Sequence, residues 1–287
     1  MDEVPTVDEL TPPDRTLMGP GPSDVHPRVL KAMSTPLVGH LDPSFIEIMD
    51  EVQDLLRYTF RTDNKWTIPV SGTGSAAMEA AIGNVVEPGD TMLVPTNGYF
   101  GDRMASMAER AGGDVVTVDA LWGQPLDPSA VEAAFDEHSP DVFGFVHAET
   151  STGVLQPSVP ELTDIAHAND ALVIADSVTS LGGVELRVDE WGIDVAYSGP
   201  QKCLSCPPGA SRSRSTTTRW TRSSPASQRP ALGTWTSRCW KGTGARNAPT
   251  ITRPRLRTCM RSVRRFASSP RKASKNAGTA TCASLAR

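Results

Sequence analysis

Residues 195–209 read VAYSGPQKCLSCPPG, an apolar run that ends in a turn of small residues with one lysine, Lys202. Lysines are scarce before it, since only Lys31 and Lys65 occur upstream. A lysine that follows a buried strand can lose its hydration, which lowers its pKa and makes the neutral amine a nucleophile toward aldehydes. The ordinary alternative is a solvated surface lysine. The residues that precede it in the sequence indicate whether Lys202 is a nucleophile or a surface residue.

Upstream of Lys202, short apolar runs alternate with segments of helical periodicity. This alternation is typical of an α/β fold, in which helices cover both faces of a mostly parallel sheet. The expected helices lie at 27–36, 42–60, 75–86, 103–112, 127–140 and 159–170. The expected strands lie within 66–70, 88–101, 114–120, 142–150, 171–176 and 193–202, the last of them ending at the lysine.

Polar residues follow the expected strands, at the edge where parallel sheets bind ligands. The segment SGTGS at 71–75 precedes a helix and can cradle a phosphate, although a plain turn is the simpler reading. Asp176 leaves a buried strand and needs a positive partner, unless it only caps a turn. Tyr99 or Phe100 could cover a flat ligand or lie in the core. Together with Lys202, these groups are the protein parts that pyridoxal phosphate requires.

Seven segments carry a more specific resemblance. They are GPGPSDVHPRVLKAM, GHLDPSFIEIMDEVQDLLRYTF, SGTGSAAMEA, NGYFGDRM, HAETSTGVLQP, DSVTSLGGVE and YSGPQKCLSCPPG. In order and spacing the chain resembles the class V aminotransferases of the alanine–glyoxylate and serine–pyruvate type over about residues 17–209. The resemblance implies an N-terminal arm at 1–22 and, at 23–209, the pyridoxal-phosphate-binding large domain of the aspartate aminotransferase fold (fold type I).

The same resemblance implies a role for each residue around the cofactor ring. Lys202 would form the internal aldimine and serve as the base that moves the α proton. Asp176 would keep the pyridine nitrogen protonated, Val178 would pack on one ring face and Phe100 would stack on the other. Ser151 would lie near the 3-hydroxyl group.

Further residues are implied at the phosphate and the substrate. Gly74 and Ser75 would bind the phosphate with help from Gln201, and Gly21 would approach the substrate. The implied reaction moves an amino group from alanine or serine to glyoxylate or pyruvate in a homodimer. A related lyase or desulfurase is the first alternative, and a non-enzymatic remnant whose basic tail binds polyanions without nucleic-acid specificity is the second.

Two features near the lysine depart from the family pattern. Pro200 stands where a serine is usual, which removes a hydrogen-bond donor and stiffens the turn. Cys203 and Cys206 form a C-x-x-C pair, but no second pair or histidine lies at zinc spacing, so no metal site is expected. A desulfurase would carry its cysteine on a mobile loop, whereas these cysteines adjoin the lysine.

Charge divides the chain sharply at residue 210. Residues 1–209 hold all 33 acidic and 10 basic residues, a net charge of −23, whereas residues 210–287 hold 18 basic residues and no acidic one. The acidic part fits a protein that is soluble at high salt, as in halophiles. The basic part predicts a disordered tail or, because its tryptophans and cysteines are scattered among arginines, a coding region read in the wrong frame.

Codon arithmetic favours the frameshift. Taking the last base of one codon with the first two of the next forces Asp from Trp235–Thr236, Leu from Cys239–Trp240 and Glu from Trp240–Lys241. With the free bases filled, the shifted frame permits strings that resemble the family downstream of its lysine. We therefore expect the small C-terminal domain to be absent or scrambled. We also expect the sheet to lack the antiparallel strand that returns after the lysine.

The cell compartment can also be inferred from the sequence. The first ten residues, MDEVPTVDEL, are acidic and lack the apolar core of a secretory signal, and no apolar run is long enough to span a membrane. Five cysteines, an odd number, fit a reducing environment better than a disulfide framework. A cytoplasmic location is therefore expected.

Overall fold

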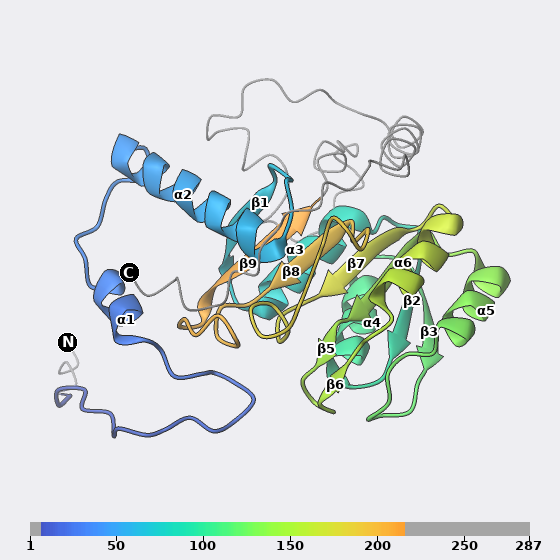
Figure 1. Cartoon of the computed structure of the whole chain (residues 1–287), viewed down its shortest axis with the longest axis horizontal. Coiled ribbons are helices and arrows are strands. Elements are labelled where there is room, and N and C mark those ends of the chain that lie inside the picture. Colours follow the sequence, from blue (N-terminus) through green and yellow to red (C-terminus); the bar gives the residue numbers. More distant parts are fainter. Residues whose placement is uncertain (1–6, 216–287) are drawn as a thin grey trace, which may run out of the picture.

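The computed structural model describes the backbone of residues 7–215 and the side chains of residues 7–209. The expected α/β fold with a mostly parallel sheet is confirmed (Figure 1). The seven-stranded sheet has the order β1-β9-β8-β7-β4-β2-β3, and within it only β9 runs against its neighbours. Its strands are β1 (Thr67–Gly72), β2 (Thr91–Thr96), β3 (Asp114–Asp119), β4 (Val142–Val146), β7 (Leu172–Asp176), β8 (Val195–Ser198) and β9 (Gly209–Ser215). A separate pair joins β5 (Ala148–Glu149) to β6 (Val154–Leu155).

Six helices are described; five lie close to their expected positions, whereas the fourth begins at Tyr99, a turn earlier than the expected 103. They are α1 (Pro27–Met33), α2 (Pro43–Phe60), α3 (Gly74–Val85), α4 (Tyr99–Arg110), α5 (Pro128–His138) and α6 (Val159–Ala168). Asp42 and Asp127 cap α2 and α5 by accepting the amide protons of Ser44 and Ser129. Within residues 7–215, no helix has the length and apolar character needed to cross a bilayer.

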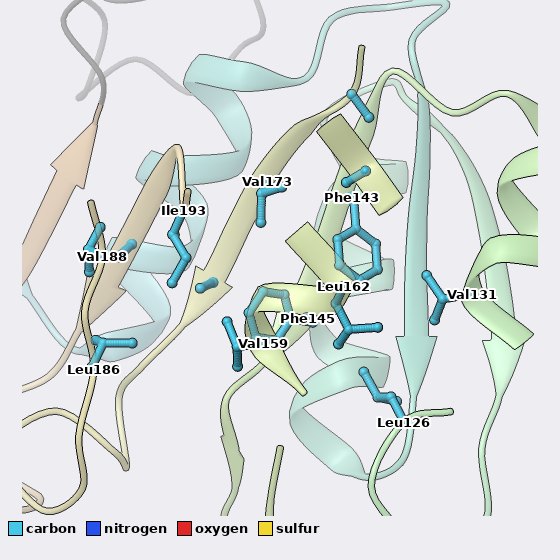
Figure 2. Packing of buried hydrophobic residues seen from close by; sticks show 14 of the residues in the cluster. Leu126, Val131, Phe143, Phe145, Val159, Leu162, Val173, Leu186, Val188 and Ile193 are labelled. Carbon is cyan, nitrogen blue, oxygen red and sulfur yellow. The ribbon is translucent and has the colours of Figure 1, made fainter. Parts of the chain in front are cut away.

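Two apolar clusters hold the helices on opposite faces of the sheet. Side chains from α2, α5 and α6 meet one face, where Phe143, Phe145, Val173 and Leu162 pack together (Figure 2). Helices α3 and α4 cover the other face. Alternate residues of β2, β4, β7 and β8 supply the two clusters, as the two-residue period of a strand requires.

The expectation that the returning strand is missing was wrong. Backbone of β9 lies between β1 and β8 and pairs antiparallel with both, so that Ser213 stands opposite Ile68 on one side and Tyr197 on the other. A strand is held by backbone N–H and C=O groups, which every residue except proline provides, so the slot can accept a sequence that does not resemble the family. The frameshift signal itself, at residues 235–241, lies outside the described residues.

One further expectation needed correction. Strand β8 ends at Ser198, so Lys202 lies in the turn beyond it and not at the strand end. The cause is Pro200, which has no N–H to continue the ladder. Helix α2 confirms the helix expected at 42–60, although few of its apolar side chains are buried. Only Leu56 and Phe60 of this helix are buried, while Ile48 and Leu55 stay about half or more exposed (49% and 62%).

Candidate active site

The candidate site lies at the carboxyl edge of the sheet, where β4, β7 and β8 end side by side. Asp176, the last residue of β7, pairs in register with Val146 of β4 and with Tyr197 of β8. Ligands of open α/β sheets bind at this edge. The segment that carries Lys202 leaves β8 at the same edge, so the topology gathers the polar residues that follow each strand.

Asp176 is a buried carboxylate with two hydrogen-bond donors. Oδ1 accepts the amide proton of Val178 at 2.8 Å, and Oδ2 accepts the hydroxyl proton of Tyr197 at 2.9 Å. The pKa of Asp176 is raised to about 6, mainly by burial and to a smaller extent by the charge of Glu149, while the two donors and Lys202 oppose the rise. The carboxylate is thus available at neutral pH to pair with a positive group.

Tyr197 was not among the predicted site residues, although the sequence contained a signal for it. Its side chain is fully buried, and burial together with the nearby Asp176 raises its pKa well above the usual value. The hydroxyl therefore stays protonated and can only donate to the carboxylate. Tyr197 is the second-last residue of β8 and pairs in register with Asp176, so a hydroxyl-bearing side chain near the end of an apolar strand was the available signal.

Lys202 is half-buried, and its amine donates to the carbonyl oxygen of Pro20 at 2.5 Å. Burial lowers its pKa, while Asp176 and Cys203 act in the opposite direction. Gly21 lies against this side chain: a Cβ there would stand 2.5 Å from Lys202 Cδ, and its φ of +125° suits glycine alone. The structure thus places Gly21 against Lys202, and its expected approach to the substrate stays a prediction.

Ser23 fixes the arm to the lysine turn and was not foreseen. Its amide donates to the carbonyl oxygen of Gln201 at 2.9 Å, and its hydroxyl donates to the carbonyl oxygen of Lys202 at 2.8 Å. These bonds join residues almost 180 positions apart in the sequence. The sequence offered only a weak signal, a small polar residue directly after the GPGP turn.

The start of α3 provides backbone N–H donors next to Val178. Gly74 and Ser75 are its first residues, whose N–H groups have no carbonyl one turn earlier to bind. A Cβ on Gly74 would stand 2.9 Å from Cγ2 of Val178, so glycine lets the two segments approach. The hydroxyl oxygen of Ser75 accepts a bond of 2.9 Å from Arg103, a residue of α4 that the sequence analysis did not select.

The buried carboxylate of Glu149 accepts hydrogen bonds from both Phe100 and Ser151. This carboxylate is 1% exposed; Oε2 accepts from the amides of Phe100 (3.0 Å) and Gly101 (3.3 Å), and Oε1 accepts from the amide (3.0 Å) and hydroxyl (2.7 Å) of Ser151. Gly98 has no room for a side chain, since a Cβ would stand 2.4 Å from Glu149 Cγ. A buried strand followed by an acidic residue was the available signal, but Asp176 alone was chosen.

The remaining candidates complete the arrangement. Gln201 folds back against Gly199, and its Oε1 is buried without a hydrogen-bond partner among the described residues. Cys203 and Cys206 are free thiols, and no cluster of three metal-binding side chains occurs within residues 7–215. An orphaned polar atom, a glycine-lined helix start, a buried carboxylate and a desolvated lysine form a donor set that fits pyridoxal phosphate.

Comparisons with known proteins agree with this geometry. Residues 17–211 match the family model described as aminotransferase class-V. A (S)-ureidoglycine–glyoxylate transaminase of Bacillus subtilis (strain 168) is 44% identical over 201 residues, which cover 70% of this chain and 48% of that protein. An alanine–glyoxylate aminotransferase of Drosophila melanogaster is 44% identical over 197 residues, or 69% of this chain and 50% of that protein.

A solved structure extends the comparison. The alanine–glyoxylate aminotransferase of Nostoc sp. superposes with a TM-score of 0.78 at 41% identity, covering 91% of this chain and 70% of that one. The chain spans about half the length of the curated relatives it matches. The shared half is the one that contains the residues described above.

Proposed function

Because the chain belongs to the class-V aminotransferase family, we propose that it binds pyridoxal phosphate at the carboxyl edge of its sheet, and that with its reading frame restored it transfers amino groups. One observation carries the proposal: Lys202 and the buried Asp176 are near enough for each to shift the pKa of the other. A nucleophilic amine beside a carboxylate for a pyridinium nitrogen is the pair that this cofactor needs.

Lys202, Asp176 and Tyr197 would each have a distinct role toward the cofactor. Bound pyridoxal phosphate supplies an electrophilic aldehyde and an electron-withdrawing ring. Lys202 Nζ would hold the aldehyde carbon and then carry the α proton of the substrate, because its lowered pKa leaves more of the amine neutral. Asp176 would hold the proton on the ring nitrogen, and Tyr197 keeps that carboxylate oriented.

The other candidates bind and orient. Val178 and Phe100 would enclose the ring, with Phe100 held by the bond from its amide to Glu149. Ser151 would face the 3-hydroxyl group, Gly74, Ser75 and Gln201 would hold the phosphate, and Gly21 would border the substrate.

Glyoxylate is the acceptor that we favour. The names of the two relatives above share glyoxylate and differ in the amino donor, ureidoglycine in one and alanine in the other. We therefore propose a small donor, alanine or serine, with ureidoglycine as the alternative, and glyoxylate or pyruvate as acceptor. The described cysteines, Cys203 and Cys206, adjoin the lysine, which disfavours a desulfurase.

We further propose a homodimer in a salt-rich cytoplasm. Helices α1 and α2 and the preceding arm expose large apolar side chains that a second copy could cover: Leu17, Met18, Leu30, Met33, Leu41, Ile46, Leu55 and Tyr58. In Figure 1 the arm and α1 run outside the compact body of the sheet. The charge of −23 over residues 1–209 favours solubility at high salt, and the odd number of cysteines favours a reducing compartment.

The proposal is tested by locating the cofactor. The full chain is mixed with pyridoxal phosphate and reduced with borohydride, which fixes the phosphopyridoxyl group to the lysine as a covalent label. The label should be found on the peptide that contains Lys202, and Lys202→Ala should remove it. Lys65→Ala is the matched control and should keep the label. Labelling at another lysine, or none, would refute the site.

A further inference from the structure

We propose that Arg103 is a direct ligand of the cofactor phosphate, supplied by α4 and opposed to the start of α3. The inference rests on the proposed function and extends it, since it adds a cationic group to a phosphate site that otherwise consists of backbone N–H groups, a hydroxyl and an amide.

Contacts with three residues, Ser75, Tyr99 and Phe100, hold the guanidinium of Arg103 against the start of α3. Nη1 donates to the hydroxyl oxygen of Ser75 at 2.9 Å, and Nη2 donates to the hydroxyl oxygen of Tyr99 at 2.8 Å. The guanidinium carbon lies 4.8 Å from the ring centroid of Tyr99 and 5.4 Å from that of Phe100. Aromatic rings on one helix thus hold a planar cation against the first turn of another.

The charge of Arg103 has no carboxylate partner in the part of the chain that the structure describes. This is unusual in a segment with 33 acidic and only 10 basic residues, where a carboxylate is easy to find. The neighbouring Asp102 lies in the same helical turn and forms no ion pair with it.

The position of this charge is also unfavourable without a ligand. A helix N-terminus carries about +0.5 elementary charge, so a guanidinium beside the first turn of α3 meets charge of its own sign. A phosphate dianion between the two reverses the sign of both interactions, and arginine binds it through paired N–H donors. The charge of Arg103 also reaches the site interior, since it acts to lower the pKa of Tyr197 against the larger effect of burial.

The experiment compares two ligands that differ only in the phosphate. The full chain, Arg103→Gln, Arg103→Lys and the control Arg110→Gln are titrated with pyridoxal phosphate and with pyridoxal, and binding is followed by visible absorbance. Arg110 ends the same helix and is exposed, so it matches Arg103 in charge and element. Circular dichroism checks that each variant is folded.

We expect Arg103→Gln to weaken binding of pyridoxal phosphate by about 10- to 100-fold, the size of a charge-assisted hydrogen bond, and to leave pyridoxal binding unchanged. Arg103→Lys should fall in between, and Arg110→Gln should resemble the unaltered chain. Equal losses for both ligands, or none in Arg103→Gln, would overturn the role of Arg103 while the proposed function stands. If the unaltered chain binds neither ligand at Lys202, both proposals fail together.

Discussion

Two buried carboxylates, Asp176 and Glu149, are held in different ways. The carboxylate oxygens of Glu149 accept from three backbone amides and one hydroxyl, so its hydrogen bonds are made within the chain. Asp176 receives two donors and lies 3% exposed, so burial raises its pKa to about 6. Glu149 is therefore suited to holding loops, whereas Asp176 retains capacity for a positive ligand.

The raised pKa of Asp176 makes a stability prediction with a definite sign. Folding favours the protonated carboxyl, so its stabilising contribution is full below the unfolded value of 3.8 and is lost as the pH rises through about 6. Asp176→Asn keeps both partners, since the hydroxyl of Tyr197 can accept from an amide. The cofactor-free variant should therefore be more stable than the unaltered chain by about 3 kcal/mol at pH 8, at 1.36 kcal/mol per pKa unit.

Urea unfolding of the two cofactor-free chains measures this difference. At pH 4.5 the difference in free energy of unfolding between the variant and the unaltered chain should fall to less than half of its value at pH 8. The control is Asp164→Asn, which replaces an exposed carboxylate and should change stability little at either pH. The same Asp176→Asn variant should bind pyridoxal phosphate more weakly. If this stability difference does not depend on pH, the charge of Asp176 is already compensated in the cofactor-free chain.

At the scale of elements, the sequence predicted those that depend on local patterns and missed one that does not. Periodicity and capping aspartates placed α2 and α5 correctly, because both signals lie within the helix itself. Strand β9 is held by its neighbours, so its own residues gave no sign of it. The same limit hid Arg103 and Ser23, whose partners come from distant segments, although the sequence did select the residues that follow the strands.

A proline tests whether β9 is a working part of the sheet. Ser213 is paired with β1 on one side and β8 on the other, so Ser213→Pro removes a ladder hydrogen bond inside the sheet. We expect a loss of at least about 1–3 kcal/mol in the free energy of unfolding, the range for an unmade buried bond. Ser213→Ala, which keeps the N–H, is the control. Identical urea midpoints for the two variants would argue that residues 209–215 are dispensable.

At the scale of the whole molecule, charge and family similarity change at nearly the same residue. The family match ends at residue 211, and all 33 acidic residues lie before residue 210. A surface of net charge −23 repels itself over about 10 Å at 0.1 M salt and over about 3 Å at 1 M, so the matched part should gain stability from salt. The 18 basic residues that follow oppose this charge within one chain.

Restoring the reading frame near codon 209 provides the sharpest test of this division. With β9 between β1 and β8, the described part of the chain as written has a seven-stranded sheet and all the candidate cofactor residues, so the chain should bind pyridoxal phosphate. Transamination needs more, because the family resemblance places the carboxylate-binding arginine and the neighbouring subunit's phosphate contacts downstream of the lysine. Precise placement of a substrate contributes several kcal/mol to a barrier, so losing these contacts should lower turnover by at least about 100-fold.

The corrected and uncorrected chains are therefore compared in the same alanine–glyoxylate assay, with cofactor content measured for each and oligomeric state determined by light scattering. We expect both to take up the cofactor, and only the corrected chain to form an active dimer. Comparable turnover by the two would mean that the first 215 residues suffice for catalysis. Codons 205–215 in the gene would show whether one base accounts for the difference, since the three residues forced by the shifted frame, Asp, Leu and Glu, depend on that single displacement.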